Sequence, residues 1–369
     1  MQMRILLVTG SYPPMPCGVG SYTAALAAAL VRTNSLEVGV LTGEGAINSN
    51  SGSGLEVVTL PCRWGWGDLG RLTRTIRKWK PDIVHVQYPT QAYGDRSAPW
   101  LIPAMLRMAG IPVVQTWHEF MPRAHWLRVA IAAMATRVIV VRPNYEASMA
   151  RWFKKLLGRA RPQYIPNAPV MEPCELTDIE RQRIRERYAP AGRNLVVYFG
   201  FMYPHKGVEQ MFEIADPERD QLVIAGYMDP AGSSYHRALA DLAAAPKWRR
   251  ATTFTGYLTE KNASDLAASA DAVIFPFRDG VGSWNTSVAG VRTLGVFVIA
   301  TARERQGYDA ETNTFFCAPD DIPAMRAALR QQAGHRIPPS SGAITEAWER
   351  IAREHIILYR ELLGSRSAR

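Results

Sequence analysis

Short apolar runs rich in Val and Ile alternate with helical patterns along the chain, and this alternation constrains the fold more than any other feature. In the first half we predict strands at residues 4–9, 37–42, 56–60, 82–87, 112–117 and 137–141. Helical patterns lie between them at residues 21–31, 69–79, 98–108 and 144–157. Strands that alternate with helices are typical of β-α-β units and a parallel sheet.

A proline-rich segment at residues 165–173, I-P-N-A-P-V-M-E-P, interrupts the alternation. Prolines remove backbone donors and disfavour helix in the residues before them, so we place a domain linker there. Strands are predicted again at residues 195–199, 221–225, 252–255, 272–275 and 297–300, and helices near 208–215, 235–244, 259–268 and 286–294. We therefore predict an α/β fold of two Rossmann-like domains, residues 1–168 and 169–343, with a terminal helix at 344–369 that packs back on the N-terminal domain.

The formal net charge of +10 favours an anionic partner: a nucleotide, a membrane surface or a nucleic acid. The densest basic patch, residues 71–80, has helical spacing and interleaved Leu72, Ile76 and Trp79. It is either a solvated amphipathic helix or an interfacial helix that touches anionic lipid. The dispersed positive residues and the lack of a recognition motif argue against nucleic acid.

The sequence shows no apolar run of the ~18 residues that a membrane span requires, and no signal peptide is recognisable at the N-terminus. We expect a cytoplasmic protein that touches the inner membrane surface at most peripherally. Cys17, Cys62, Cys174 and Cys317 form no C-x-x-C pair, which suits reduced thiols and predicts no metal site.

Residues 194–207, N-L-V-V-Y-F-G-F-M-Y-P-H-K-G, combine a buried strand with Gly200, Lys206 and Gly207 before a helix start. A glycine at a strand end lets backbone approach a ligand closely, and a helix start favours an anion. In open α/β sheets, ligands bind beyond the carboxyl ends of strands, and two such sheets facing each other make a cleft. A phosphate site is expected here.

Four of the loops that follow strands resemble, in this order, those of the retaining GT-B glycosyltransferases of family 4, which transfer sugars from nucleotide donors. The first loop, P-P-M-P-C-G-V-G-S-Y, opens an alanine-rich helix with Gly18, Gly20 and Ser21. In the second, P-V-V-Q-T-W-H-E-F, His118 falls on a family histidine that contacts the donor sugar, and Glu119 beside it is a further candidate.

The third loop, residues 200–207, is similar to the family's G-R-L-x-x-x-K-G. Lys206 falls on the lysine that neutralises the donor diphosphate, whereas Phe201 stands where the family has an arginine. The fourth segment, F-T-G-Y-L-T-E-K-N-A-S-D-L-A-A-S-A-D-A-V-I-F-P, follows the family's strand, turn, helix and strand-proline pattern. The resemblance places Tyr257 and Leu258 at the donor base.

The chain departs from the family after Pro276, where the family carries two glutamates eight positions apart. Counted back from Gly295, these positions hold Gly282 and Gly290, which marks a divergent member without the paired glutamates. Asp279, in F-R-D-G-V-G-S-W-N-T-S-V, could take the role of the first glutamate. The same loop could cradle phosphate at a helix start through Gly280, Gly282, Ser283, Asn285 and Thr286.

The resemblance implies a retaining hexosyltransferase that moves a sugar from a UDP- or GDP-sugar to a lipid-linked or polysaccharide acceptor held by the N-terminal domain. It needs neither cofactor nor metal, since catalysis rests on leaving-group stabilisation and positioning. His118, Lys206 and Asp279 are the catalytic candidates. Two alternatives stay open. One is a catalytically silent GT-B protein that binds a ligand or partner enzyme; the other is a nucleotide-sugar epimerase, for which only His118 and Glu119 offer acid/base groups.

Overall fold

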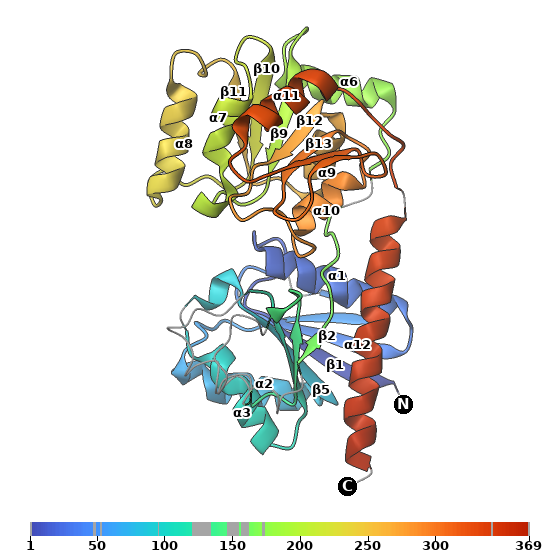
Figure 1. The fold of residues 1–369 in the computed structure, drawn as a ribbon. Coiled ribbons are helices and arrows are strands. Elements are labelled where there is room, and N and C mark those ends of the chain that lie inside the picture. Colours follow the sequence, from blue (N-terminus) through green and yellow to red (C-terminus); the bar gives the residue numbers. More distant parts are fainter. Residues whose placement is uncertain are drawn as a thin grey trace. The chain divides into compact units, whose positions relative to one another are not determined.

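The computed structural model describes residues 2–46, 49–51, 54–94, 96–119, 134–145, 155, 162–171, 174–340 and 342–367 (Figure 1). The chain forms two compact units. The first consists of Met1–Asn167 together with Ala347–Arg369, and the second of Ala168–Glu346. Each unit contains one largely parallel sheet with helices on its faces.

The first unit contains an eight-stranded sheet in the order β3-β4-β2-β1-β5-β6-β7-β8. All neighbouring strands are parallel except β3 and β4. The first six predicted strands are confirmed within two residues at each end. The strands are β1 (Met3–Val8), β2 (Leu36–Thr42), β3 (Ser49–Ser51), β4 (Leu55–Thr59), β5 (Ile83–Tyr88), β6 (Val113–Trp117), β7 (Arg137–Val140) and β8 (Gln163–Tyr164).

Helices cover both faces of this sheet, which explains the continuous apolar strands (Figure 1). α2 (Leu69–Trp79) and α3 (Ala98–Met108) pack on one face, while α1 (Gly18–Arg32) and α12 (Ala343–Ser367) lie on the other. Successive β5 residues point to opposite faces, so Val84 and Val86 join the α2 and α3 core while His85 and Gln87 face α1 and α12. Short 3-10 turns lie at η1 (Trp66–Asp68) and η2 (Gln91–Tyr93).

The apolar stripe of α2 is buried in the core of the first unit. Leu72 and Ile76 are fully buried in the core, and Trp79 is nearly so. The insertion of this stripe into lipid is therefore excluded, while a contact of the basic side chains with anionic headgroups stays a prediction. The basic side chains of the helix stay exposed: Arg71, Arg74, Arg77, Lys78 and, at its end, Lys80.

The predicted terminal helix carries a buried polar cluster onto the first sheet. Tyr359 on α12 hydrogen-bonds to His85 Nδ1 (2.6 Å), whose Nε2 contacts Thr116 Oγ1 (2.7 Å). His355 on the same helix donates from Nδ1 to the Ile351 carbonyl (2.8 Å), and its ring centroid lies 5.5 Å from that of His85. The interpretation of His85 as a core residue is confirmed.

We expect this cluster to make the first unit sensitive to acid. Burial lowers the pKa of His355 to about 4, that of His118 to about 3 and that of His85 well below 6.5. The unfolded chain binds more protons than the folded one below pH 6.5, so the free energy of unfolding falls as pH drops through that value. Urea titrations at about pH 7.5 and about pH 5 measure this difference.

His355→Leu should reduce the pH dependence, and His205→Gln, at an exposed position, should leave it unchanged. An equal free energy of unfolding at both pH values in the unmodified protein would contradict the expectation.

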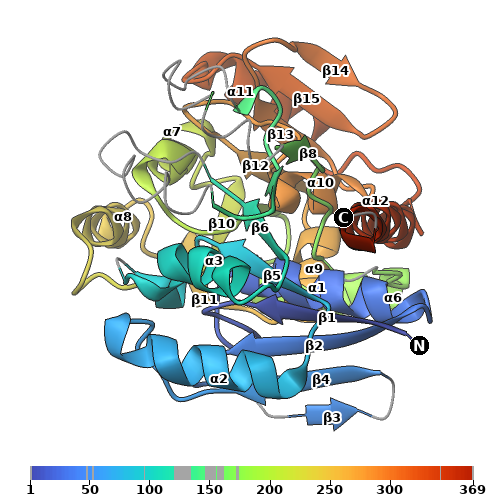
Figure 2. The same ribbon diagram turned by 90° about the horizontal axis from the view of Figure 1, so that it is seen from below.

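The second unit contains a seven-stranded sheet in the order β11-β10-β9-β12-β13-β15-β14. Its strands are parallel except for the β14–β15 hairpin at one edge (Figure 2). The five predicted strands are confirmed to within one residue, and β14 and β15 are additional. The strands are β9 (Asn194–Phe199), β10 (Asp220–Ala225), β11 (Thr252–Gly256), β12 (Ala272–Phe275), β13 (Val298–Thr301), β14 (Gly307–Asp309) and β15 (Thr314–Cys317).

The helical elements of this unit connect the parallel strands or pack beside them. They are α6 (Asp178–Tyr188), η6 (Pro204–Lys206), η7 (Val208–Gln210), α7 (Met211–Ile214), α8 (Ser234–Ala244), α9 (Glu260–Ser269), α10 (Thr286–Arg292) and α11 (Ile322–Gln332). The four predicted helices correspond to η7 with α7, α8, α9 and α10, whereas α6 and α11 were not predicted. The helix predicted at residues 144–157 lies largely outside the described residues. Within the described part of the chain, no helix is long and apolar enough to span a membrane.

Candidate functional site

The strand order of the second sheet defines a switch point between β9 and β12. The chain runs outward from β9 through β10 to β11, then returns to the other side of β9 to form β12 and β13. Loops diverge at the carboxyl ends of two such strands, which is where open α/β sheets bind ligands. Here the loops begin at Gly200 after β9 and at Pro276 after β12.

These two loops are in contact through residues 205–207 of the first and residues 276–278 of the second. At Gly207, whose φ is 61°, a Cβ atom would lie 2.3 Å from the Pro276 carbonyl oxygen. Lys206 Nζ lies 3.8 Å from the ring centroid of Phe277, and the Arg278 N–H donates to the His205 carbonyl (3.0 Å). The loop after β12 therefore holds the lysine-bearing loop at the switch point.

Lys206 brings a cation to the place where the sequence predicted a phosphate site. Its side chain is partly buried, and the face of the Phe277 ring, itself 3% exposed, stabilises the ammonium by a cation–π contact. A preorganised ammonium at the carboxyl ends of parallel strands can neutralise a diphosphate.

Aromatic rings occupy the place of the family's arginine. Phe201 stacks on Tyr203 with ring centroids 6.2 Å apart, and Tyr203 stacks on His205 at 5.7 Å. Tyr203 is 51% exposed. The loop thus offers stacking surface where the family offers a second charge.

The residues expected at the donor base follow β11, two strands away from β9. β11 ends at Gly256, whose φ is 71°, and Tyr257 beside it is 46% exposed while Leu258 is half-buried. Tyr227, after β10, is 47% exposed. The exposed tyrosine rings after β10 and β11 present flat surfaces on which a base can stack.

The two glycines in place of the family's glutamates are packed against larger neighbours. A Cβ atom at Gly282 would lie 2.3 Å from the Trp284 ring, and one at Gly290 would lie 2.7 Å from Met171 Sδ. A carboxylate side chain at either position would meet these neighbours. The loss of the glutamates is therefore matched by the surrounding packing.

The remaining predicted phosphate residues lie in the loop between β12 and α10. The side chain of Asp279 is 77% exposed, and one of its oxygens lies 3.8 Å from Arg303 Nη2. Gly282 N donates to Asn285 Oδ1 (2.8 Å), and this contact closes the turn before α10. Gly280 and Ser283 belong to the same loop, and Thr286 is the first residue of α10.

The first unit has its own switch point, between β1 and β5. The loop after β1 leads into α1, where a Cβ atom at Gly20 would lie 3.0 Å from the Ser11 carbonyl oxygen, so this glycine permits close packing. Ser21 N donates to the Cys17 carbonyl (2.9 Å) in the first turn, which begins at Gly18. The structure thus gives Gly20 a packing role that the sequence did not predict.

His118 follows β6 at the same edge of this unit. It is 8% exposed, its Nε2 lies 2.9 Å from Gln87 Oε1, and its ring meets Tyr22 edge-on at 4.6 Å. Because its pKa is lowered to about 3, the imidazole is neutral near pH 7 and offers a hydrogen bond without charge. Glu119 beside it is exposed.

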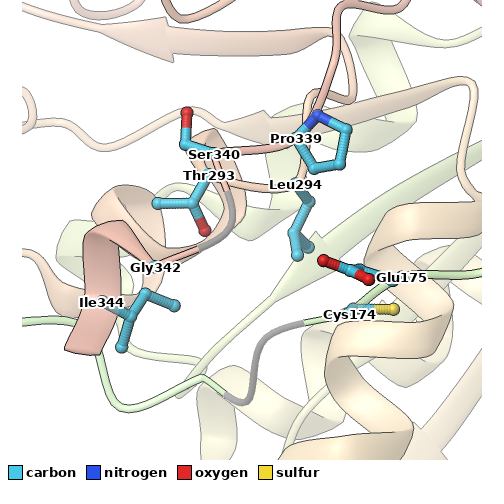
Figure 3. A pocket seen from close by; sticks show the side chains of 8 residues that line it. All are labelled: Cys174, Glu175, Thr293, Leu294, Pro339, Ser340, Gly342 and Ile344. Carbon is cyan, nitrogen blue, oxygen red and sulfur yellow. The ribbon is translucent and has the colours of Figure 1, made fainter.

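Among the described residues, no group of three His, Cys, Asp or Glu side chains could hold a metal ion. A small pocket of the second unit has room for about one water molecule. Figure 3 shows its lining residues, Cys174, Glu175, Thr293, Leu294, Pro339, Ser340, Gly342 and Ile344. It contains none of the predicted site residues.

The sequence analysis missed two residues of the switch point, Phe277 and Arg278. Both stand in the quoted F-R-D-G segment, directly after the strand-proline pattern. Because both residues lie far along the chain from His205 and Lys206, nothing in the sequence indicated that Phe277 contacts Lys206 or that Arg278 contacts His205.

Comparison with known proteins shows what the chain is similar to. Residues 17–168 match the family model of the glycosyl transferase 4-like domain. The chain as a whole matches solved GT-B glycosyltransferase structures over nearly its full length. The predicted α/β fold of GT-B type and the resemblance to family 4-like glycosyltransferases are therefore confirmed. A comparison with curated proteins found no match.

Three solved structures illustrate the likeness. Sucrose-phosphate synthase from Thermosynechococcus elongatus has a TM-score of 0.72 and 17% identity, with 99% of this chain and 100% of that chain covered. HepE from Anabaena, in complex with UDP and glucose, has a TM-score of 0.64 and 14% identity over the full length of both chains. Starch synthase IV from Arabidopsis thaliana, bound to ADP and acarbose, has a TM-score of 0.65 and 14% identity, with 98% of this chain and 99% of that chain covered.

Proposed function

We propose that this protein transfers a hexose-type sugar from a UDP- or GDP-sugar to an acceptor, with retention and without a metal ion. The observation that carries the proposal is Lys206, held over Phe277 at the switch point of the second sheet. Solved structures of the same fold hold UDP, UDP-glucose or ADP, which supports a nucleotide donor.

The proposed chemistry needs little from side chains beyond electrostatics. The bond between the anomeric carbon and the diphosphate oxygen breaks while Lys206 stabilises the leaving group. The acceptor hydroxyl gives its proton to the departing diphosphate and forms the new bond on the same face of the sugar. Neutral His118 is proposed to hydrogen-bond the sugar, and Asp279 to replace the first family glutamate.

The proposed acceptor is a lipid-linked or polysaccharide precursor bound by the N-terminal unit, on the cytoplasmic side of the membrane. The exposed cationic side of α2 supports a peripheral contact with anionic lipid headgroups. Loss of cosedimentation with phosphatidylglycerol vesicles in Arg74→Gln/Arg77→Gln would support this contact. Equal cosedimentation of this variant and the unmodified protein would oppose it.

A panel of nucleotide sugars tests the proposed activity. The protein is incubated with each donor, with and without acceptor extracts, and the released nucleotide is measured. We expect release from one UDP- or GDP-sugar, increased by an acceptor, and a product that keeps the donor's anomeric configuration by NMR. No release from any donor would contradict the proposal.

Packing around Gly282 and Gly290 supports one alternative function, a catalytically silent protein. Trp284 and Met171 fill the space at the two glutamate positions, and this packing supports a catalytically silent GT-B protein. Such a protein would bind nucleotide tightly and would release no nucleotide from a nucleotide sugar. The epimerase alternative is disfavoured, because burial keeps His118 neutral and leaves it a poor acid. Analysis of products formed without any acceptor separates these outcomes.

A further inference from the structure

Arg278 joins two carboxylates that come from distant parts of the second unit. Its guanidinium forms a close ion pair with Glu209 on η7, and its Nη1 lies 2.8 Å from Asp320 Oδ1 before α11. The planar fork of an arginine can reach two acceptors in fixed directions, which a lysine cannot do. Arg278 therefore bridges the loop after β12 to two other loops.

Each of the two carboxylates also has a second, neutral donor. Tyr235 Oη on α8 donates to Glu209 Oε2 (2.5 Å) and accepts from the Val208 N–H (3.0 Å). Gln210 Nε2 donates to Asp320 Oδ1 (2.5 Å). Three of these residues, Val208, Glu209 and Gln210, make up η7, so the network fixes this short helix from several sides.

Along the chain, Lys206 lies between His205 and Glu209, which both bind Arg278. On one side, the Arg278 backbone N–H binds the His205 carbonyl; on the other, the Arg278 side chain binds Glu209. The Lys206 ammonium rests on Phe277, the residue before Arg278. A lysine has a flexible four-carbon stem, so fixing its backbone on both sides limits where the charge can go.

We propose that Arg278 is a positioning residue, which holds the Lys206 ammonium where the donor diphosphate would bind. The expected effect on nucleotide binding rests on the proposed function, whereas the contacts of Arg278 do not depend on it. The side chain of Arg278 is 45% exposed, and exposed ion pairs contribute little to stability. Its replacement should therefore leave the protein folded while it frees the lysine-bearing loop.

The first test measures the position of Lys206 without any nucleotide. Competitive acetylation followed by peptide mass spectrometry reports how fast Lys206 reacts relative to other lysines. We expect Arg278→Gln to increase its rate several-fold. Arg326→Gln, which removes an exposed arginine bound to the Glu213 carbonyl, should leave the rate unchanged. An unchanged rate in Arg278→Gln would overturn the proposal.

The second test measures UDP and GDP binding by calorimetry. Arg278→Gln should weaken binding about tenfold, because a displaced charge loses much of its effect. The same change made in a Lys206→Met background should have almost no further effect, since Arg278 acts through Lys206. Arg278→Lys should not restore binding, because one ammonium cannot bridge both carboxylates. Full rescue by lysine, or an undiminished effect without Lys206, would show direct contact with the ligand and overturn the proposal.

The two tests separate the two claims. If the unmodified protein binds neither nucleotide, the proposed function fails while the acetylation rate still decides the position of Lys206. If nucleotide binds and the acetylation rate does not respond to Arg278→Gln, the positioning role alone fails.

Discussion

Lys206→Met is expected to lower kcat/KM for the nucleotide sugar about 100-fold, because it removes the cation that stabilises the departing diphosphate. Methionine keeps the length and apolar character of the stem, so contact with the Phe277 ring can persist without the charge. The measurement is nucleotide release under initial-rate conditions with the donor identified in the panel, accompanied by a urea titration.

Lys247→Met is the matched control, because it removes an exposed lysine of the same unit far along the chain from either switch-point loop. It should keep full activity. Equal activity of Lys206→Met and the unmodified protein would remove Lys206 from the mechanism. A similar loss in the control would show that the net charge of the unit matters rather than this position.

Gly207→Ala is expected to cause a large loss of stability in the second unit. A Cβ atom there adds two costs: about 1–2 kcal/mol for a left-handed backbone conformation, and about 1–3 kcal/mol for overpacking against the Pro276 carbonyl oxygen. Relief of the clash would move the loop away from β12, so donor binding should weaken as well.

Two glycines of the same unit separate these costs. At Gly192 the φ is 84° and the space around a Cβ atom is open, so Gly192→Ala should show the conformational cost alone. At Gly226 no left-handed φ is involved, but a Cβ atom would lie 2.1 Å from the Gly200 carbonyl oxygen. Urea titration of the three variants should rank Gly207→Ala below both controls; equal stability of Gly207→Ala and Gly192→Ala would refute the predicted clash.

The sequence predicted the central strands well because buried parallel strands are short, apolar and rich in β-branched residues. It missed α6, which contains no buried residue and therefore lacks an apolar stripe. A signal was present: Thr177 and Glu180 form a capping box at its start. The two-residue strand β8 and the short hairpin of β14 and β15 have too few residues for a pattern to be visible.

The candidate site was predictable where the residue types themselves carry the chemistry. A glycine, a lysine and a glycine after a buried strand predicted a phosphate site, and the structure places Lys206 at the switch point of the second sheet. Phosphate binding there stays a prediction. The contacts of Arg278 were not predictable, because its partners Glu209 and Asp320 lie 69 and 42 residues away in the sequence. Nor could the sequence show that Trp284 and Met171 fill the space beside Gly282 and Gly290.

A crystal structure of the protein soaked with UDP, and separately with GDP, addresses the role of the second unit most directly. We predict a nucleotide at the carboxyl ends of β9 to β12, with a diphosphate oxygen about 3 Å from Lys206 Nζ. A bound nucleotide whose diphosphate lies away from Lys206, or no nucleotide at saturating concentration, would contradict the account.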